Sequence, residues 1–407
     1  MNNISITVIG LGYIGLPTAA LLSSKKFNVT GVDVNPEVVD TVNRGNIHII
    51  EPGLGSIVSE SVSSGFLKAS LNVSSSDVFL ICVPTPFKQS ESGAKEPDVS
   101  YVMRAAKTIA PFIKKGNLII LESTSPVGTT EDLIKELEGN GAKTDGVHIC
   151  YCPERVLPGN IMHELVFNDR IIGGVNPESA IAGKKFYELF VKGEVSSTNS
   201  RTAEMCKLVE NSYRDVNIAF ANEISIICNS EGIDSWELIS LANKHPRVDI
   251  LQPGVGVGGH CIAVDPWFIV SKSPENSKLI KKAREINNYK TDWVIKKIEQ
   301  SYAEANNNYD GDLSIVCLGL AFKPNIDDLR ESPALYVTKT LADKGYKLKA
   351  VEPNISSNKH IELITLDEID FQKDLIVFLV KHKEFLDKNF LEKIKNKNYL
   401  DFCGINS

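Results

Sequence analysis

Short apolar runs, each followed by turn residues, recur through the first part of the chain. They lie at 4–9, 28–33, 78–83, 118–121 and 147–152, and stretches with helical spacing of apolar residues separate them. A continuous apolar run of this length is typical of a strand that is buried on both faces of a sheet. Strands that alternate with helices favour parallel pairing. The pattern therefore predicts an α/β fold with a doubly wound, mostly parallel sheet.

Three further apolar runs follow residue 312, at 313–318, 348–351 and 375–380. A polar stretch at 306–311 precedes them and is the expected linker. Ser332 and Pro333 predict the start of a helix, because serine caps free backbone amides and proline fits the first helical position. This second β-α-β pattern predicts a smaller α/β domain over residues 312–407.

Two long stretches between these regions have the apolar period of amphipathic helices. They cover 202–231, which contains no glycine or proline, and 277–305. The chain is therefore predicted to consist of two Rossmann-like doubly wound domains, residues 1–200 and 312–407, joined by a central helical region at 201–305.

A glycine motif follows the first predicted strand and opens a helix. Gly10 permits a tight turn, Gly12 lets the backbone approach a pyrophosphate, and Gly15 allows close packing of helix on strand. Asp33 ends the second predicted strand, where a carboxylate binds both ribose hydroxyls and repels a 2′-phosphate. The motif predicts a dinucleotide site that prefers NAD to NADP.

Two threonines follow later strands of the same region. Thr85 comes after 78–83, and Thr124 comes after 118–121. Ligands of open α/β sheets bind beyond the carboxyl ends of the strands, which makes both residues candidates for the nicotinamide side of the site. The alternative is that they are ordinary cap or turn residues.

Cys261 lies in a run of glycines at positions 254, 256, 258 and 259, and Asp265 follows one helical turn later. Glycines remove side chains from the approach to the sulfur, so we expect a bulky substrate to reach it. The alternative is a buried cysteine that packs as a small hydrophobe. Next to an NAD domain, an accessible thiolate can oxidise an aldehyde through a thioester, and we therefore predict that Cys261 is a nucleophile.

Lys207, Asn211 and Arg214 share one face of the predicted central helix. The face is either solvated or a surface for an anion and sugar hydroxyls, and a lysine there is suited to acid–base catalysis. Lys323 and Arg330 lie in a loop after a strand of the last region. They are candidates for phosphate contacts or, alternatively, plain surface charges.

Composition narrows the class of protein. The net charge of −7 and the absence of a long basic run argue against nucleic acid as a partner. The eight cysteines are scattered, which is typical of thiols in a reducing compartment. No signal peptide or membrane span is evident, so no membrane partner and a cytoplasmic location are expected. His148, Cys150 and Cys152 alternate on one strand but lack a fourth ligand, so no metal is expected.

In chain order, these features resemble the UDP-glucose/GDP-mannose dehydrogenase family over nearly the whole length. The motifs that carry the resemblance are Gly-Leu-Gly-Tyr-Ile-Gly from Gly10, Val-Pro-Thr-Pro from Val83, Ser-Thr-Ser-Pro-Val-Gly from Ser123, Cys-Pro-Glu-Arg from Cys152, Lys207 with Asn211, Gly-Gly-His-Cys ending at Cys261 with Asp265, and Phe-Lys-Pro from Phe322 with Leu-Arg-Glu-Ser from Leu329.

The resemblance implies a four-electron oxidation that uses two NAD⁺. The C6 alcohol of a UDP-sugar becomes an aldehyde, Cys261 forms a thioester, and water releases the uronic acid. Lys207 is implied in acid–base catalysis and oxyanion stabilisation, Asn211 and Asp265 in support of the oxyanion and a water, and Glu154 in thioester hydrolysis.

The resemblance also implies binding residues and an assembly. The residues implied to contact NAD are Gly10, Gly12, Tyr13, Ile14, Gly15, Asp33, Thr85, Thr124 and Arg330. The residues implied to bind the UDP-sugar are Arg155, Val156, Lys207, Asn211, Arg214, His245, Arg247, Gly258 and Lys323. The central region is implied to form a homodimer or higher homo-oligomer in which Arg247 reaches the partner's site.

Three segments narrow the expected substrate. The stretches 151–159, 244–248 and 319–333 resemble the family members that oxidise UDP-N-acetyl-D-mannosamine for bacterial surface polysaccharides, including the enterobacterial common antigen type. Cys152 and Arg155 depart from the Asn-Pro-Glu-Phe that is usual in UDP-glucose enzymes. The expected product is UDP-N-acetyl-D-mannosaminuronic acid, with UDP-glucose or another UDP-N-acetylhexosamine as the alternative substrate.

Other enzyme classes fit the sequence less well. A nucleotide-sugar epimerase or dehydratase usually needs Tyr-x-x-x-Lys, and none of the eleven tyrosines has a lysine four residues later. A two-electron dehydrogenase needs no cysteine, and a non-catalytic NAD sensor needs neither Cys261 nor Lys207 with Glu154.

Overall fold

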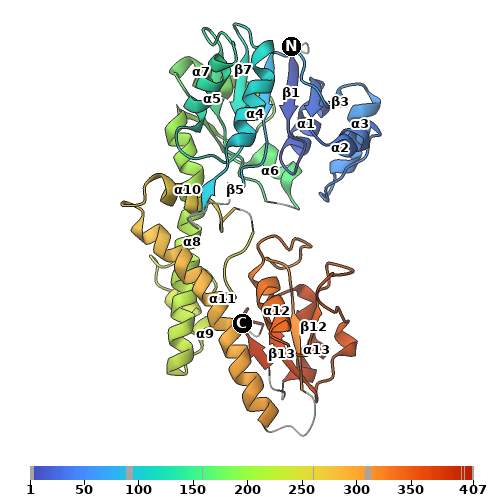
Figure 1. The fold of residues 1–407 in the computed structure, drawn as a ribbon, viewed down its shortest axis with the longest axis vertical. Helices are drawn as coiled ribbons and strands as arrows, with labels where there is room; N and C mark the ends of the chain where they lie inside the picture. The colour runs from blue at the N-terminus through green and yellow to red at the C-terminus, as the bar shows by residue number, and fades with distance from the viewer. Residues whose placement is uncertain are drawn as a thin grey trace. The chain divides into compact units, whose positions relative to one another are not determined.

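The computed structural model describes residues 4–88, 95–157, 159–259, 261–307, 313–395, 397 and 399–405. The chain divides into two compact units, Met1–Val209 with Trp267–Lys272, and Glu210–Pro266 with Ser273–Ser407. His260 and most of the predicted linker at 306–311 lie outside the described residues. Figure 1 labels the elements of both units.

Unit one is built on an eight-stranded sheet with the order β10-β9-β8-β7-β4-β1-β2-β3. Its strands are β1 (Ser5–Ile9), β2 (Asn28–Val32), β3 (Leu67–Ser70), β4 (Val78–Ile81), β7 (Leu118–Leu121), β8 (His148–Tyr151), β9 (Arg170–Gly174) and β10 (Val195–Asn199). All neighbours pair in parallel except β8 with β9. A separate two-stranded ribbon joins β5 (Phe87–Lys88) to β6 (Glu96–Pro97).

Helices cover both faces of this sheet, as a doubly wound fold requires. One buried cluster joins strand residues such as Val8 to α1, α3, α6 and α7, and the other joins residues such as Phe79 to α4 and α5. The helices of unit one are α1 (Gly15–Ser24), α2 (Pro36–Asn43), α3 (Leu54–Ser63), α4 (Ser100–Ile109), α5 (Thr129–Gly139), α6 (Ile161–Phe167) and α7 (Pro177–Tyr187), with the short 3₁₀ helix η1 (Ala110–Phe112). The predicted α/β class is confirmed.

Helices make up the first part of unit two. They are α8 (Ser200–Glu231), which starts in unit one, α9 (Ser235–Ala242), α10 (Asp265–Lys272), which ends in unit one, and α11 (Lys278–Asn307). No helix in the described part of the chain has both the length and the apolar character that crossing a bilayer demands.

A four-stranded parallel sheet completes unit two, in the order β12-β11-β13-β14. Its elements are β11 (Ser314–Leu318), α12 (Pro333–Asp343), β12 (Leu348–Val351), η2 (Leu366–Glu368), β13 (Asp374–Phe378), η3 (Lys383–Leu386), α13 (Lys388–Ile394) and β14 (Tyr399–Asp401). Ser332 caps α12 by accepting from the Leu335 amide, and Pro333 is its first residue, as predicted. This second sheet is the predicted C-terminal α/β domain.

Buried polar groups hold α8 against α11. Asp215 is fully buried and pairs with Arg284 at 2.6 Å, and it also accepts from Asn287 at 2.8 Å. About two turns after Asp215 on α8, Asn222 donates to Asn287, and about one turn beyond that Lys290 donates to Ser225. Because each buried polar group needs its partner, this seam fixes the register of the two helices.

Candidate functional site

The turn after β1 confirms the steric role predicted for each glycine. Gly10 has a φ of +90°, and a Cβ there would lie 2.7 Å from the Cys82 carbonyl oxygen. A Cβ on Gly15 would lie 1.8 Å from the Gly10 carbonyl oxygen, so only glycine fits where α1 meets the turn. Gly12 faces open space. A pyrophosphate therefore has backbone amides and a helix amino terminus to bind, with no side chain in the way.

Asp33 lies directly after β2, beside this turn. Its Oδ2 accepts from the Leu11 amide and its Oδ1 accepts from the Asn35 amide, both at 2.9 Å. The carboxylate is thereby fixed at the edge of the glycine turn, where a ribose is expected. Tyr13, which is exposed, and Ile14, which is half-buried, complete the turn.

The two predicted threonines lie together. Thr85 follows β4 and Thr124 follows the neighbouring strand β7, and the Thr85 hydroxyl donates to the Thr124 carbonyl oxygen at 2.7 Å. Both belong to the carboxyl-end edge of the sheet, where the nicotinamide side was predicted.

Glu154 follows β8 at the same edge and is buried. Its Oε2 accepts from the Val156 amide at 2.7 Å, whereas its Oε1 is buried and has no hydrogen-bond partner among the described residues. Burial raises the pKa of Glu154, and the positive charges of Arg170 and Lys207 oppose that rise. A buried carboxyl with a raised pKa is suited to taking a proton from water.

A cluster behind Glu154 has no motif in the sequence and was not predicted. The Arg170 guanidinium is buried 5.7 Å from the centre of the Tyr187 ring. Glu122, also buried, accepts from the Tyr187 hydroxyl and, at 3.1 Å, from the Cys82 thiol. Arg170 begins β9 after a short helix, so its burial is visible only once the sheet is formed.

The thiol segment lies in unit two together with two of the predicted catalytic residues. The Asp265 amide donates to the Cys261 carbonyl oxygen at 2.8 Å, which confirms the predicted turn. Asn211, buried on α8, donates to Asp265 Oδ2 at 2.5 Å. Lys207 lies one turn before Asn211 and is half-buried, whereas Arg214 is exposed. The structure therefore links Asn211, Asp265 and the Cys261 backbone in one chain of contacts.

The glycines before Cys261 have a different role from the predicted one. A Cβ on Gly256 would lie 2.4 Å from Thr291 Oγ1, one on Gly258 would lie 2.6 Å from the Glu331 carbonyl oxygen, and one on Gly259 would lie 2.9 Å from the Phe322 ring. Three of the four missing side chains therefore face protein. The prediction that they clear a path for substrate is wrong at these three positions, because the loop needs glycine to pack closely on its own unit.

The remaining predicted residues lie on loops of unit two. Arg330 forms a bidentate pair with Asp328, and its carbonyl oxygen accepts from the Gly259 amide at 3.3 Å. Lys323 follows Phe322 and is half-buried. His245 and Arg247 are exposed after α9. Arg155 and Val156 of unit one are half-buried beside Glu154.

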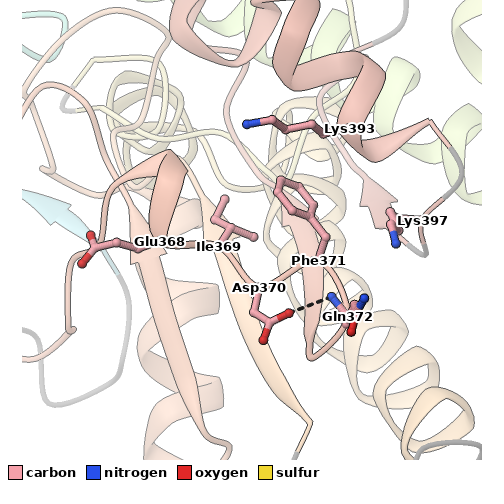
Figure 2. A pocket seen from close by; sticks show the side chains of 7 residues that line it. All are labelled: Glu368, Ile369, Asp370, Phe371, Gln372, Lys393 and Lys397. Atoms are coloured by element: carbon pink, nitrogen blue, oxygen red, sulfur yellow. Dashed lines mark hydrogen bonds between the residues drawn. The ribbon is translucent and has the colours of Figure 1, made fainter.

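A hollow of about 520 Å³ lies elsewhere in the C-terminal sheet domain (Figure 2). Its lining residues are Glu368, Ile369, Asp370, Phe371, Gln372, Lys393 and Lys397. They precede β13 and β14, so the hollow opens at the amino ends of the strands. Ligands of such sheets bind at the opposite, carboxyl ends, and the hollow is therefore not the predicted nucleotide site.

Comparisons with known proteins agree with this geometry. Three models of the UDP-glucose/GDP-mannose dehydrogenase family match the chain: the NAD binding domain over residues 4–191, the central domain over 201–289 and the UDP binding domain over 316–406.

Two relatives and one solved structure are similar over nearly their full length. UDP-N-acetyl-D-mannosamine dehydrogenase of Escherichia coli (strain K12) is 53% identical over 95% of both chains. NDP-N-acetyl-D-galactosaminuronic acid dehydrogenase of Ralstonia nicotianae is 49% identical over 98% of this chain and 96% of its own. The structure of UDP-D-ManNAc dehydrogenase from Pyrococcus horikoshii has a TM-score of 0.89 at 39% identity, covering 99% of this chain and 96% of that one.

Replacing Asp33 with Asn tests the cofactor preference. Asn keeps an acceptor for the Leu11 amide but loses the charge that strengthens bonds to the ribose hydroxyls, a loss worth about 2–3 kcal/mol. We expect NADH to bind roughly 30- to 150-fold more weakly, and the gap to NADPH to narrow, in fluorescence titrations. Asp40→Asn, at an exposed position on α2, is the matched control. Equal affinity of the parent protein for NADH and NADPH would contradict the assignment.

Proposed function

The chain belongs to the UDP-glucose/GDP-mannose dehydrogenase family, and we propose that it oxidises UDP-N-acetyl-D-mannosamine to UDP-N-acetyl-D-mannosaminuronic acid with NAD. The observation that supports this substrate is the 53% identity to the Escherichia coli enzyme named UDP-N-acetyl-D-mannosamine dehydrogenase. Another UDP-N-acetylhexosamine is the second candidate, because a relative named for a galactosamine derivative is 49% identical. UDP-glucose is the third.

NAD⁺ held at the glycine turn and Asp33 would accept one hydride in each of two successive oxidations. In the first oxidation Lys207 removes the proton of the C6 hydroxyl while the carbon loses a hydride, which leaves an aldehyde. The Cys261 thiolate then adds to the aldehyde carbon, and loss of the second hydride leaves a thioester on the sulfur. Asn211 and Asp265 lie next to the Cys261 backbone, which supports their proposed role in holding the oxyanion and a water.

Glu154 completes the reaction in this proposal. Its Oε1, buried and without a hydrogen-bond partner in the described part of the chain, is an acceptor for a proton of the attacking water. Attack of the resulting hydroxide on the thioester carbon releases the Cys261 thiolate and the uronic acid. The proposed use of that acid is a bacterial surface polysaccharide of the enterobacterial common antigen type, made in the cytoplasm.

Assays with purified protein test the substrate. We expect NAD and UDP-N-acetyl-D-mannosamine to give two NADH for each uronic acid, measured by absorbance and by product mass. Cys261→Ala should produce no acid, whereas Cys403→Ala, at another half-buried thiol, should leave turnover unchanged. Faster turnover of UDP-glucose or UDP-N-acetylglucosamine would overturn the substrate, and one NADH for each product would overturn the four-electron scheme.

Glu154→Gln should separate hydrolysis from oxidation. Without a base the thioester persists, so we expect Cys261 to gain the mass of the bound sugar acid while acid release falls by about 10²–10⁴-fold. In the parent protein Glu154 works as a carboxylate and its pKa is raised. Acid release should therefore decline, as pH falls, at a higher pH than an ordinary carboxyl would give, and the variant should lack this decline. The exposed Glu178→Gln is the control. Loss of activity with no covalent adduct would exclude Glu154 from hydrolysis.

The proposed active unit is a homodimer or larger, formed through the central helices. Tyr213, Phe220 and Ile227 recur every seven residues on α8, and each is at least 49% exposed. Leu238 and Leu241 of α9 are exposed as well. A stripe of large apolar side chains of this kind is typical of a covered surface.

A mixing experiment tests whether Arg247 acts in the partner's site. Cys261→Ala and Arg247→Ala should each be inactive, and mixing them should restore partial turnover, because one hybrid site then holds both residues. Mass spectrometry of labelled subunits verifies that exchange has taken place. Continued inactivity after verified exchange would place Arg247 in its own subunit's site.

A further inference from the structure

Two buried residues meet at the carboxyl ends of the second sheet. Glu352 directly follows β12, and His382 lies beyond β13; both side chains are fully buried. Glu352 Oε2 accepts from the Leu320 amide at 2.7 Å, from the Ala321 amide at 3.0 Å and from His382 Nε2 at 3.1 Å. Burial alone would raise the pKa of Glu352, but these hydrogen bonds, led by the one from His382, hold it below the ordinary value. The carboxylate thus holds the loop that leaves β11.

His382 holds the far end of the same loop. Its Nδ1 accepts from the Asn325 amide at 2.9 Å, and the Lys383 amide donates to Asn325 Oδ1 at 2.9 Å. Because Nδ1 accepts from a backbone amide, the imidazole is neutral and carries its proton on Nε2, facing Glu352. Asn325 has a φ of +62°, an uncommon conformation for asparagine that these bonds sustain. Glu352 therefore holds the start of loop 319–325, and His382 holds its end.

The middle of this loop supports the thiol segment. Phe322 lies under Gly258 and Gly259, so closely that an added Cβ would come within 2.8 Å and 2.9 Å of it. The Phe322 amide donates to the Asp328 carbonyl oxygen, which closes the loop above it. The Gly259 amide donates to the Arg330 carbonyl oxygen of the same loop system. Gly259 is two residues before Cys261, so the position of the sulfur depends on the position of Phe322.

We propose that Glu352 and His382 are positioning residues for Cys261, acting through the 319–325 loop and Phe322. The role in turnover rests on the proposed function, whereas the structural link from Glu352 and His382 to the thiol segment does not. Their separation from Cys261 in the sequence, by 91 and 121 residues, hides the link until the fold is known.

A nucleotide-binding role for Glu352 fits less well. The turn after β11 repeats the turn after β1: Gly319 has a φ of +93°, and the Leu320 amide bonds to Glu352 as the Leu11 amide bonds to Asp33. Ala321, fully buried, replaces the open Gly12, so no pyrophosphate can approach there. The oxygens of Glu352 are also taken by five donor groups, which leaves it no role at a ribose.

The test compares His382→Ala with His382→Asn and uses two readouts. Ala removes the ring's hydrogen bonds with Asn325, Glu352 and Asn354. Asn places an oxygen near the former Nδ1 and can accept from the Asn325 amide. The first readout is the rate at which iodoacetamide alkylates Cys261, followed by peptide mass with the other cysteines as internal references. The second is kcat and KM for the UDP-sugar. The exposed His360→Ala is the matched control.

For His382→Ala we expect several-fold faster alkylation of Cys261 alone, because a loosened segment exposes the sulfur. We expect kcat to fall at least about tenfold, because the thiol no longer meets the substrate carbon. His382→Asn should restore most of the parent alkylation rate and most of the parent kcat. If His382→Ala does not fold, Phe322→Leu, which leaves the buried pair intact, should give the same two changes. Unchanged or slower alkylation, or a rise in KM alone, would overturn the proposal. The alkylation result stands even if the parent protein does not turn over UDP-N-acetyl-D-mannosamine, which separates this proposal from the proposed function.

Discussion

The burial of Asp215 between α8 and α11 is the constraint on which the geometry of unit two depends. A charge without solvent must keep its partners, and removing one from a buried pair typically costs about 3–5 kcal/mol. Arg284 and Asn287 both bind Asp215 Oδ1 and so fix one helix against the other. From this fixed seam Asn222 accepts from the Gly254 amide, and Thr291 donates to the Val255 carbonyl oxygen. The helices thus present both Asn211 and the start of the thiol segment in a defined register.

The thiol segment is supported from two sides. At its start, the backbone of Gly254 and Val255 forms hydrogen bonds with Asn222 and Thr291 of the long helices. Near its end, Gly258 and Gly259 pack on Phe322 of the sheet domain. Close packing on both supports leaves no room for side chains at Gly256, Gly258 and Gly259. A reactive group in a loop gains from such support, because catalysis is sensitive to small displacements of the reacting atom.

Patterns local in the sequence predicted much of this molecule. The glycine turn, the two long helices and the Ser332 cap follow rules that act over a few residues, and the structure confirms them. Asp33 lies directly after β2 as expected, and its contact with a ribose stays a prediction. The strands β3, β9 and β10 were missed because they are short or carry polar residues; the β10 sequence, Val-Ser-Ser-Thr-Asn, resembles a loop. The family was recognised from motifs, and the comparisons confirm it. Arg170 and His382 could not be found, because their partners come from distant segments.

The turn after β1 and the turn after β11 share a backbone geometry but differ in what their acidic residue binds. Both turns have a left-handed glycine, an amide that bonds to an acidic residue after the next strand, and a parallel sheet around them. At the first turn the acidic residue is Asp33, which lies where a ribose is expected. At the second it is Glu352, which binds His382. The Gly-x-Gly-x-x-Gly motif marks only the first of the two turns, whereas the left-handed glycine and the amide-to-carboxylate bond mark both. The backbone of the turn and its ligand are separable properties, and only the first is conserved between the two halves.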